Sequence, residues 1–204
     1  SPLAMGGFAT TLLTFSLSLM DIRGTSIEAI HSGNLILVAG LGLLISAQWE
    51  MARGNTFSYT VLSAFGLFYA SYGVMMLPFM GVIEAYGGLT PAYYNAMGFY
   101  LLIWGIFNLF FLIASLPKNI VYISIFTTVE LCFLSDAASH FAFADHRVAI
   151  ADGLGKTSGA FGFVAGLLGY YATAHYLCEE ALPFRVPMGD TSRFFRNMKK
   201  SESN

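Results

Sequence analysis

A stretch of 64 residues, from residue 54 to residue 117, contains a single charged side chain, Glu84. A water-soluble fold has too little interior to bury so long a stretch, because a small domain keeps much of its surface in contact with water. The whole chain agrees: 56% of its 204 residues are hydrophobic and 11% are charged, whereas a soluble domain carries about 25% charged residues. The sequence therefore predicts a polytopic membrane protein.

The rest of the composition excludes several classes of function. A formal net charge of -2 and a pI near 6.0 leave no basic face for nucleic acid. The two cysteines, Cys132 and Cys178, lie in apolar runs and lack both the spacing of a metal site and the number needed for a disulfide framework. The chain contains no CxxC, GxGxxG, P-loop, HExxH or GxSxG motif. We therefore expect no enzyme activity, no cofactor and no metal.

Six segments are apolar and long enough to cross a bilayer core, which needs about 20 residues per helix. They cover residues 2–20, 33–49, 57–77, 96–116, 119–135 and 155–178. The predicted fold class is all-α, with six transmembrane helices in one channel domain over residues 1–180. A basic tail over residues 181–204 follows it.

An even number of spans places both termini on one side of the membrane. If that side is the cytoplasm, the inner segments hold seven basic residues and the outer segments three, in agreement with the positive-inside rule. The inner residues are Arg53, Lys118, Arg185, Arg193, Arg196, Lys199 and Lys200. The outer residues are Arg23, Arg147 and Lys156. We therefore expect both termini to be cytoplasmic.

Small residues repeat along the sixth segment at spacings of three and four. They are Gly155, Gly159, Gly162, Gly166, Gly169 and Thr173. Such a stripe lets a neighbouring helix backbone approach closely. The stripe would also suit the smooth wall of a pore, but helix packing is the favoured interpretation.

Ionisable side chains at membrane depth are the next candidates for function, since each costs at least about 2.5–3.5 kcal/mol to place there. Glu130 and Asp136 lie in the fifth segment, six residues apart. Either could line an aqueous path and handle protons or cations. Alternatively, Asp136 is interfacial, and Glu130 is neutral or bonded to a neighbouring helix. His140 and His175 are more typical of interfacial or packed positions than of a proton relay.

Aromatic residues recur at helical spacing in three of the segments. The stripes comprise Phe8, Thr11 and Phe15; Phe65, Tyr69 and Tyr72; and Trp104, Phe107 and Phe111. Most such residues face lipid or another helix. A hydrophobic constriction that gates a pore by dewetting would have the same pattern, so periodicity alone leaves both interpretations open.

Several short motifs resemble those of the acetate uptake transporter family, which includes bacterial acetate–succinate permeases and fungal acetate and ammonium-export proteins. Residues 1–11, SPLAMGGFATT, resemble the family's Asn-Pro-x-Pro-Leu-Gly-Leu-x-x-Phe signature. Residues 49–57, WEMARGNTF, look like its Glu-x-x-x-x-Asn-Thr-Phe element. Residues 81–86, 95–104 and 139–141 are similar to the fungal branch, and the motifs occur in order along the whole chain.

The resemblance implies a six-helix protomer with a pore through it, assembled as a homo-hexamer in the plasma membrane. It also implies that acetate and related small monocarboxylates pass through a ring of three bulky residues. When each motif is aligned with the family pattern without gaps, the three ring residues correspond to Phe8, Phe65 and Val129. Phe65 stands where the family usually has tyrosine, and Val129 stands where it usually has leucine. The ring therefore keeps its apolar character but loses a hydroxyl group and some bulk.

The rest of the expected substrate path consists of Leu3, Thr11, Asn55, Thr56, Tyr69, Trp104 and Glu130. Asn55 and Thr56 could hold a carboxylate with side-chain donors and the amides of a helix N-terminus, or they could form a plain helix cap. Three departures from the family matter here. Leu43 replaces a polar glutamine, Glu130 occupies a position that is usually threonine, and Asp136 falls where the family has a small or apolar residue. An ionised Glu130 would repel an anion, whereas burial favours its neutral form.

Three functional hypotheses follow, all with the lipid bilayer as partner and none with nucleic acid. The leading one is a hexameric channel or transporter for acetate-class monocarboxylates. The second keeps the fold but carries ammonia, ammonium or a small neutral amide such as urea, and Glu130 is the residue that favours it. The third is a membrane sensor or scaffold that transports nothing and uses its basic tail to contact anionic lipid or a partner.

Overall fold

The computed structural model describes residues 1–25, 28–179, 183–184 and 186–201. Within these residues every regular element is a helix, so the predicted all-α class is confirmed. The long helices are α1 (Pro2–Leu19), α3 (Thr56–Met75), α5 (Pro91–Ser115), α6 (Ile120–Ala144) and α7 (Val148–Cys178), together with a π-helical segment (Asn34–Leu41) that continues into α2 (Gly42–Ala52). The shorter elements are α4 (Val82–Ala85), α8 (Ser192–Ser201) and 3-10 turns at Ile22–Gly24, Glu28–His31 and Pro78–Met80.

Side-chain caps explain where three of these helices begin. The side-chain oxygens of Asn55, Thr90 and Asn119 accept hydrogen bonds from backbone N–H groups in the first turns of α3, α5 and α6, respectively. Each cap satisfies a donor that the helix itself leaves unpaired. Pro91 occupies the first turn of α5, where its missing N–H carries no cost.

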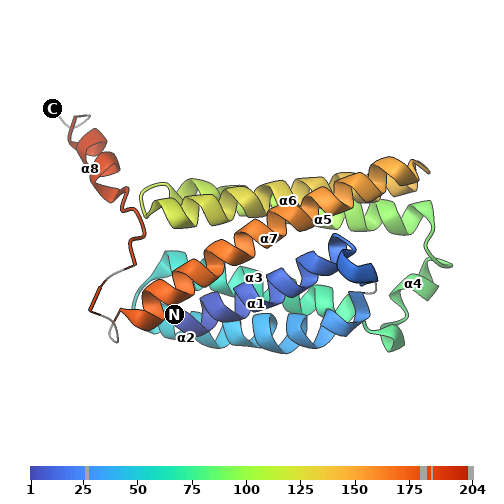
Figure 1. Ribbon diagram of the computed structural model, residues 1–204, viewed down its shortest axis with the longest axis horizontal. Coiled ribbons are helices and arrows are strands. Elements are labelled where there is room, and N and C mark those ends of the chain that lie inside the picture. Colours follow the sequence, from blue (N-terminus) through green and yellow to red (C-terminus); the bar gives the residue numbers. More distant parts are fainter. Residues whose placement is uncertain (26–27, 180–182, 185, 202–204) are drawn as a thin grey trace.

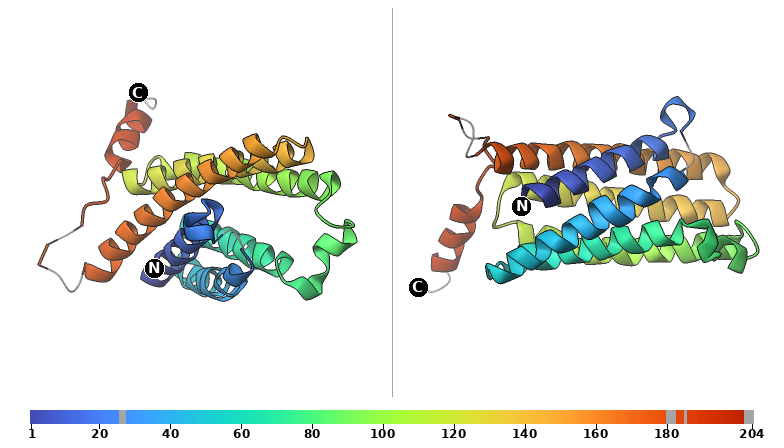
Figure 2. Two further views of the ribbon diagram at one scale, coloured as in Figure 1. Left: turned by 45° about the vertical axis from the view of Figure 1, so that its right-hand side comes forward. Right: turned by 90° about the horizontal axis from the view of Figure 1, so that it is seen from below.

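The long helices lie side by side in one bundle (Figures 1 and 2). Helix α7 packs against both α6 and α1, α5 packs against α6, and α2 packs against α3. The N-terminus and α8 lie at the same end of the bundle, as an even number of spans requires, while α4 lies at the opposite end.

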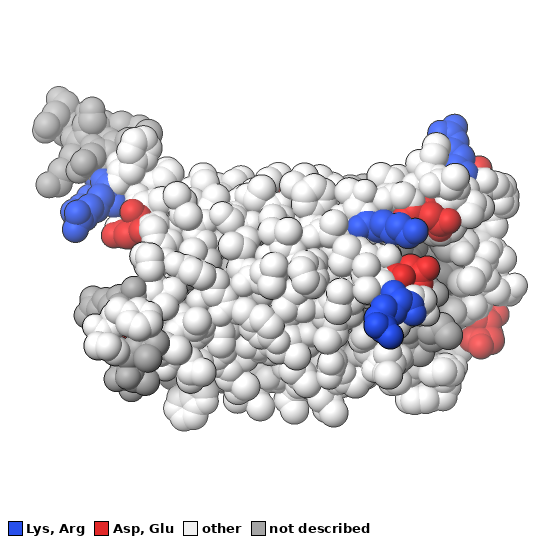
Figure 3. All heavy atoms as spheres, in the orientation of Figure 1, with Lys and Arg blue, Asp and Glu red and all other residues white. Residues whose placement is uncertain are grey.

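The outer surface of the bundle fits a bilayer. By length and composition four helical segments could cross a membrane: Pro2–Leu19, Asn34–Ala52, Pro91–Ser115 and Ile120–Ala144. A fifth span is possible if α3 is joined to Pro78–Ala85, which turns away from it by 81°. Helix α7, at 31 residues, is long enough to cross a bilayer but is not among the segments that also qualify by composition. On the face shown in Figure 3, charged side chains gather at the two ends and the middle band is uncharged.

Several helix ends differ from the sequence-based expectation. Helix α5 begins at Pro91 rather than near residue 96, and α6 continues to Ala144 rather than ending near residue 135. Because α6 is longer than expected, Asp136 lies more than two turns inside it and is 7% exposed. Asp136 is therefore packed among the helices rather than at the end of α6, where the sequence-based bounds had placed it.

The glycine stripe of α7 is a packing surface, as predicted. A Cβ added at Gly159 would lie 2.9 Å from the backbone oxygen of Ser16, and one added at Gly166 would lie 2.5 Å from Leu13 Cγ. Both contacts come from α1, so the two helix backbones approach closely along this stripe. Gly155 faces α6 instead, since its added Cβ would lie 3.4 Å from Ser139 Oγ.

Residues 186–191, part of the expected tail, are tied to the end of the bundle. The N–H of Ile120 donates to the oxygen of Gly189 at 2.8 Å, and the hydroxyl of Thr191 donates to the oxygen of Leu116 at 2.6 Å. The hydroxyl of Tyr171 donates to the oxygen of Pro187 at 2.6 Å. Arg185 and the expected domain boundary at residues 180–181 lie outside the described residues.

Candidate functional site: two cavities and the residues between them

Two cavities lie inside the bundle and meet at Phe65 and Val129, which line both of them. The first has a volume of about 60 Å³ and the second about 50 Å³. A sphere the size of one water molecule occupies on the order of 10–15 Å³. Each cavity therefore has room for a small solute.

The predicted ring of Phe8, Phe65 and Val129 lies around the first cavity, so the structure brings all three residues together. The rings of Phe8 and Phe65 meet edge to face with centroids 6.4 Å apart, and none of the three residues is more than 6% exposed. Gly169 helps to position Phe8, because a Cβ at Gly169 would lie 3.0 Å from Phe8 Cδ1. Packing from α1, α3, α6 and α7 thus holds these apolar side chains in place.

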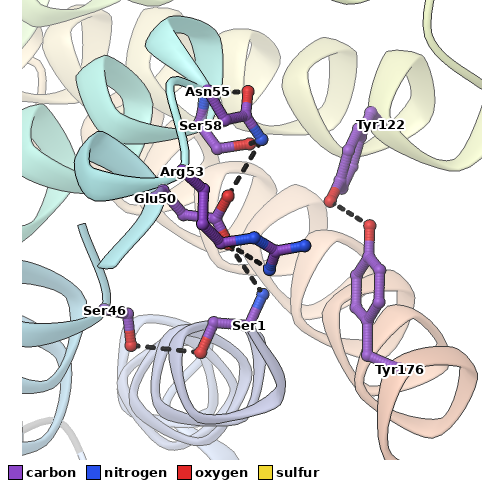
Figure 4. A network of polar contacts seen from close by, with 8 residues as sticks. All are labelled: Ser1, Ser46, Glu50, Arg53, Asn55, Ser58, Tyr122 and Tyr176. Atoms are coloured by element: carbon purple, nitrogen blue, oxygen red, sulfur yellow. Dashed lines mark hydrogen bonds and ion pairs between the residues drawn. The ribbon is translucent and has the colours of Figure 1, made fainter. Parts of the chain in front are cut away.

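The first cavity has polar groups near the N-terminus of α3 (Figure 4). Glu50 is 6% exposed and lines this cavity, and its carboxylate lies 3.8 Å from the guanidinium of Arg53. The side-chain amide of Asn55 donates to Glu50 at 2.9 Å and to the hydroxyl of Ser58 at 2.8 Å. Ser58 and Tyr122 also line the cavity, and the Tyr122 and Tyr176 hydroxyls are 2.5 Å apart.

The second cavity lies beyond Phe65 and Val129, and its walls are mainly aromatic and aliphatic. Tyr69 and Tyr72 line it from α3, and Asp136 lines it from α6. Asp136 thus places a carboxyl group against an otherwise largely apolar space. The two cavities are thus separated by apolar side chains, with Phe65 and Val129 contributing to both linings.

Comparisons with known proteins agree with this architecture. The model of the GPR1/FUN34/yaaH family matches residues 1–190. The chain belongs to this family. It is 45% identical over 199 residues to the acetate transporter protein patA of Aspergillus clavatus, covering 98% of this chain and 81% of the relative. It is 30% identical over 198 residues to the ammonia transport outward protein 2 of Saccharomyces cerevisiae, covering 93% of this chain and 67% of the relative.

A solved structure shares the fold of this GPR1/FUN34/yaaH family member. The bacterial acetate channel SatP superposes with a TM-score of 0.78, covering 92% of this chain and 97% of SatP. The two sequences are 24% identical. The family assignment and the shared fold confirm the resemblance that the sequence motifs indicated.

Of the seven path residues expected from the sequence, Tyr69 lines one of these two cavities and the other six line neither. Leu3 is 60% exposed on the outside of the bundle, and Thr56 is exposed at the start of α3. Thr11 is fully buried, and its hydroxyl donates to the oxygen of Asn34 at 3.4 Å. Trp104 packs on Phe68, with ring centroids 5.1 Å apart.

The side chain of Asn55 does not have the free donors that binding a substrate carboxylate would need. Its amide donors bind Glu50 and Ser58, and its oxygen accepts from the N–H of Ser58 at 3.3 Å. Asn55 is therefore the plain helix cap that the sequence also allowed. Ser58, Tyr122 and Glu50 carry hydroxyl or carboxyl groups and line the first cavity, but no sequence motif had marked them as site residues.

Glu130 lies between α5 and α6 rather than along either cavity. The amide of Asn108 donates to Glu130 Oε2 at 2.8 Å and to the backbone oxygen of Phe126 at 3.0 Å. Asn108 is 1% exposed. Asn108 was not among the residues predicted from the sequence, although an asparagine deep inside an apolar span is a signal of the same kind as Glu130. This geometry fits the alternative that Glu130 is bonded to a neighbouring helix.

We expect Glu130→Leu to destabilise the protein without changing which solute it carries. The substitution removes an acceptor from a buried amide, which costs about 1–3 kcal/mol. Thermal unfolding in detergent should show a lower midpoint for Glu130→Leu and a near-normal midpoint for Glu130→Gln, which keeps an acceptor. A change in the preference between acetate and ammonium caused by Glu130→Gln would contradict this structural role.

Proposed function

We propose that this chain is a membrane channel or transporter for acetate and related small monocarboxylates. The observation that carries the proposal is the pair of cavities of about 60 and 50 Å³ that meet at Phe65 and Val129. Each is large enough for a solute the size of acetate, which has four non-hydrogen atoms. The 45% identity to an acetate transporter protein and the fold shared with an acetate channel support the same cargo.

The apolar residues between the cavities explain how such a path could discriminate among solutes. A hydrated ion must lose water to pass bulky apolar side chains, and hydrophobic constrictions close by dewetting. A small monocarboxylic acid carries a methyl or short alkyl group that packs against Phe8, Phe65 and Val129. The constriction therefore favours small, weakly hydrated solutes, and the described residues around it include no group arranged for catalysis.

The assembly and location of the protein are part of the proposal. We propose a homo-hexamer in the plasma membrane with both termini in the cytoplasm. The excess of basic residues in the inner segments and the tail supports this orientation. The first 180 residues form the channel domain in this proposal, and residues 181–204 form a basic cytoplasmic tail.

Ammonia or ammonium is the second candidate cargo, because the chain is 30% identical to an ammonia transport outward protein. Glu130 was the sequence feature that favoured this cargo, but it lines neither described cavity. A urea-like amide and a sensor without transport have no particular feature of the described structure in their favour. Acetate-class acids therefore remain the leading candidate.

The test is a measurement of internal pH in liposomes that contain the full chain, with leakage from empty liposomes subtracted. Acetate and ammonium are added separately. We expect protein-dependent acidification with acetate, because an acid that enters releases its proton inside. Protein-dependent alkalinisation with ammonium alone would instead support ammonia as the cargo, and the absence of both signals would contradict a transport function.

A further inference from the structure

The proposed transport path does not involve helix α8 (Ser192–Ser201), which contains four basic residues and no acidic one. The side chains of Arg193 and Arg196 are exposed, and that of Phe194 is 68% exposed. The ring centroids of Phe194 and Phe195 are 5.6 Å apart, so an aromatic pair accompanies the two arginines. A helix of ten residues is marginally stable by itself in water. Helix α8 would therefore gain stability from a surface that covers this pair.

The residue before α8 fixes the level at which this helix begins. The hydroxyl of Thr191 donates to the oxygen of Leu116 at 2.6 Å, and its N–H donates to the oxygen of Lys118 at 3.3 Å. Leu116 and Lys118 belong to the short connection between α5 and α6, two helices that qualify as membrane spans. Helix α8 begins at the next residue, Ser192. It therefore starts where two apolar spans end, which is the headgroup level of a bilayer.

The direction of α8 also suits the surface of a membrane. In every view of Figures 1 and 2, α8 runs across the long helices rather than along them. Helices that span a bilayer tilt by about 20° on average from its normal, so a helix that runs across them lies close to the membrane plane. Interfacial amphipathic helices take this orientation, with aromatic side chains at the boundary between headgroups and acyl chains.

We propose that α8 docks on the anionic surface of the membrane that its own bundle spans. Phe194 and Phe195 occupy the boundary between headgroups and acyl chains, and Arg193 and Arg196 bind anionic lipid headgroups. The cytoplasmic leaflet is the one that carries anionic phospholipids, and the excess of basic residues favours a cytoplasmic location for α8. The inference goes beyond the transport function and holds for any cargo.

Charge complementarity decides in favour of anionic lipid. A guanidinium group can donate two parallel hydrogen bonds to one phosphate group. Each basic residue near an anionic surface favours the bound state by about fivefold, so Arg193 and Arg196 together contribute about thirtyfold. Asp190 does not compete for these arginines from within α8, since its Oδ1 accepts the N–H of Ser192 at 2.8 Å at the start of the helix.

The test measures contact between α8 and lipid in liposomes that contain the full chain. Phe194→Trp places a fluorescent indole on α8, and the emission of the wild type, which comes from Trp49 and Trp104, is subtracted. Phosphatidylcholine with bromine atoms near the headgroup end of its acyl chains quenches an indole at the membrane surface. Quenching is compared in this lipid alone and in its mixture with phosphatidylserine. Both leaflets have the same composition, so the orientation of the protein does not affect the result.

Two further variants separate the charge of α8 from the charge of the whole protein. The charge variant adds Arg193→Gln and Arg196→Gln to Phe194→Trp. The matched control adds Arg23→Gln and Arg147→Gln instead, which removes two exposed arginines outside α8. Flotation with the liposomes shows for each protein that it is inserted.

We expect severalfold more quenching with phosphatidylserine than without it, loss of that difference in the charge variant, and its retention in the control. Equal quenching in the two lipids by inserted Phe194→Trp protein would overturn the binding of anionic headgroups. Absence of quenching by the brominated lipid would overturn docking on the membrane altogether. In that case strong quenching by aqueous iodide would show a solvated helix, and weak quenching by iodide would show a helix covered by another copy of the chain.

Discussion

Replacing Phe65 by alanine is expected to join the two cavities and to raise protein-dependent acetate uptake by about tenfold, which corresponds to about 1.4 kcal/mol removed from the barrier. Phe65 lines both cavities, and its ring contacts those of Phe8, Tyr69 and Phe126. Removing the ring takes away a side chain that stands between the two cavities. Uptake of butyrate, a larger monocarboxylate, should rise by a greater factor than uptake of acetate.

The matched control for Phe65→Ala is Phe111→Ala. Both side chains are 6% exposed, and their ring centroids are 5.9 Å apart, but Phe111 lines neither cavity. Each substitution removes a buried ring at a cost of about 3–5 kcal/mol in stability. Phe8→Ala should also raise acetate uptake, because it too removes a bulky ring from the first cavity. Equal uptake by correctly assembled Phe65→Ala and Phe111→Ala proteins would show that Phe65 does not control the path.

Replacing Gly159 by valine is expected to lower the stability of the folded protein markedly. A Cβ at this position would lie 2.9 Å from the backbone oxygen of Ser16, 2.8 Å from Met20 Cγ and 3.0 Å from Leu19 Cβ. Backbone atoms cannot rotate out of the way, so α1 must move away from α7. Overpacking of this kind typically costs about 1–3 kcal/mol and occasionally more. The measurement is the fraction of protein that elutes as a folded species in detergent, together with its unfolding temperature.

Gly153→Val provides the control within the same helix. A Cβ at Gly153 has no heavy atom within 4 Å, so the substitution tests the effect of valine in α7 without the contact to α1. We expect Gly153→Val to elute and unfold nearly as the wild type does. Equal stability of the two variants would contradict the conclusion that the glycine stripe lets α7 pack closely on α1.

The sequence motifs selected three residues that line one cavity together, but most of the other expected path residues line neither cavity. Phe8, Phe65 and Val129 were placed by motifs of the family, and these three residues meet in the structure. Leu3, Thr11, Thr56 and Trp104 lie elsewhere because position along a helix does not specify the direction in which a side chain points. In membrane helices that are apolar on every side, periodicity marks no inner face.

For Glu130 and Asp136, too, the sequence did not specify the direction in which each side chain points. They are six positions apart on α6, which at 3.6 residues per turn separates their directions by about 120° around the helix axis. One therefore faces Asn108 of α5, while the other faces the second cavity. Both were recognisable as ionisable groups at membrane depth, but their partners come from residues far away in the sequence.

The sequence by itself determined the membrane class, the series of long apolar helices, the glycine stripe and the family, because each depends on composition or on spacing along one segment. The tertiary structure alone decided that Asp136 borders a cavity, that Glu130 does not, and that Asn55 uses its donors as a helix cap. Those outcomes depend on how each helix is rotated about its axis. That rotation is set by packing against neighbouring helices, such as α1 against Gly159 and Gly166 of α7.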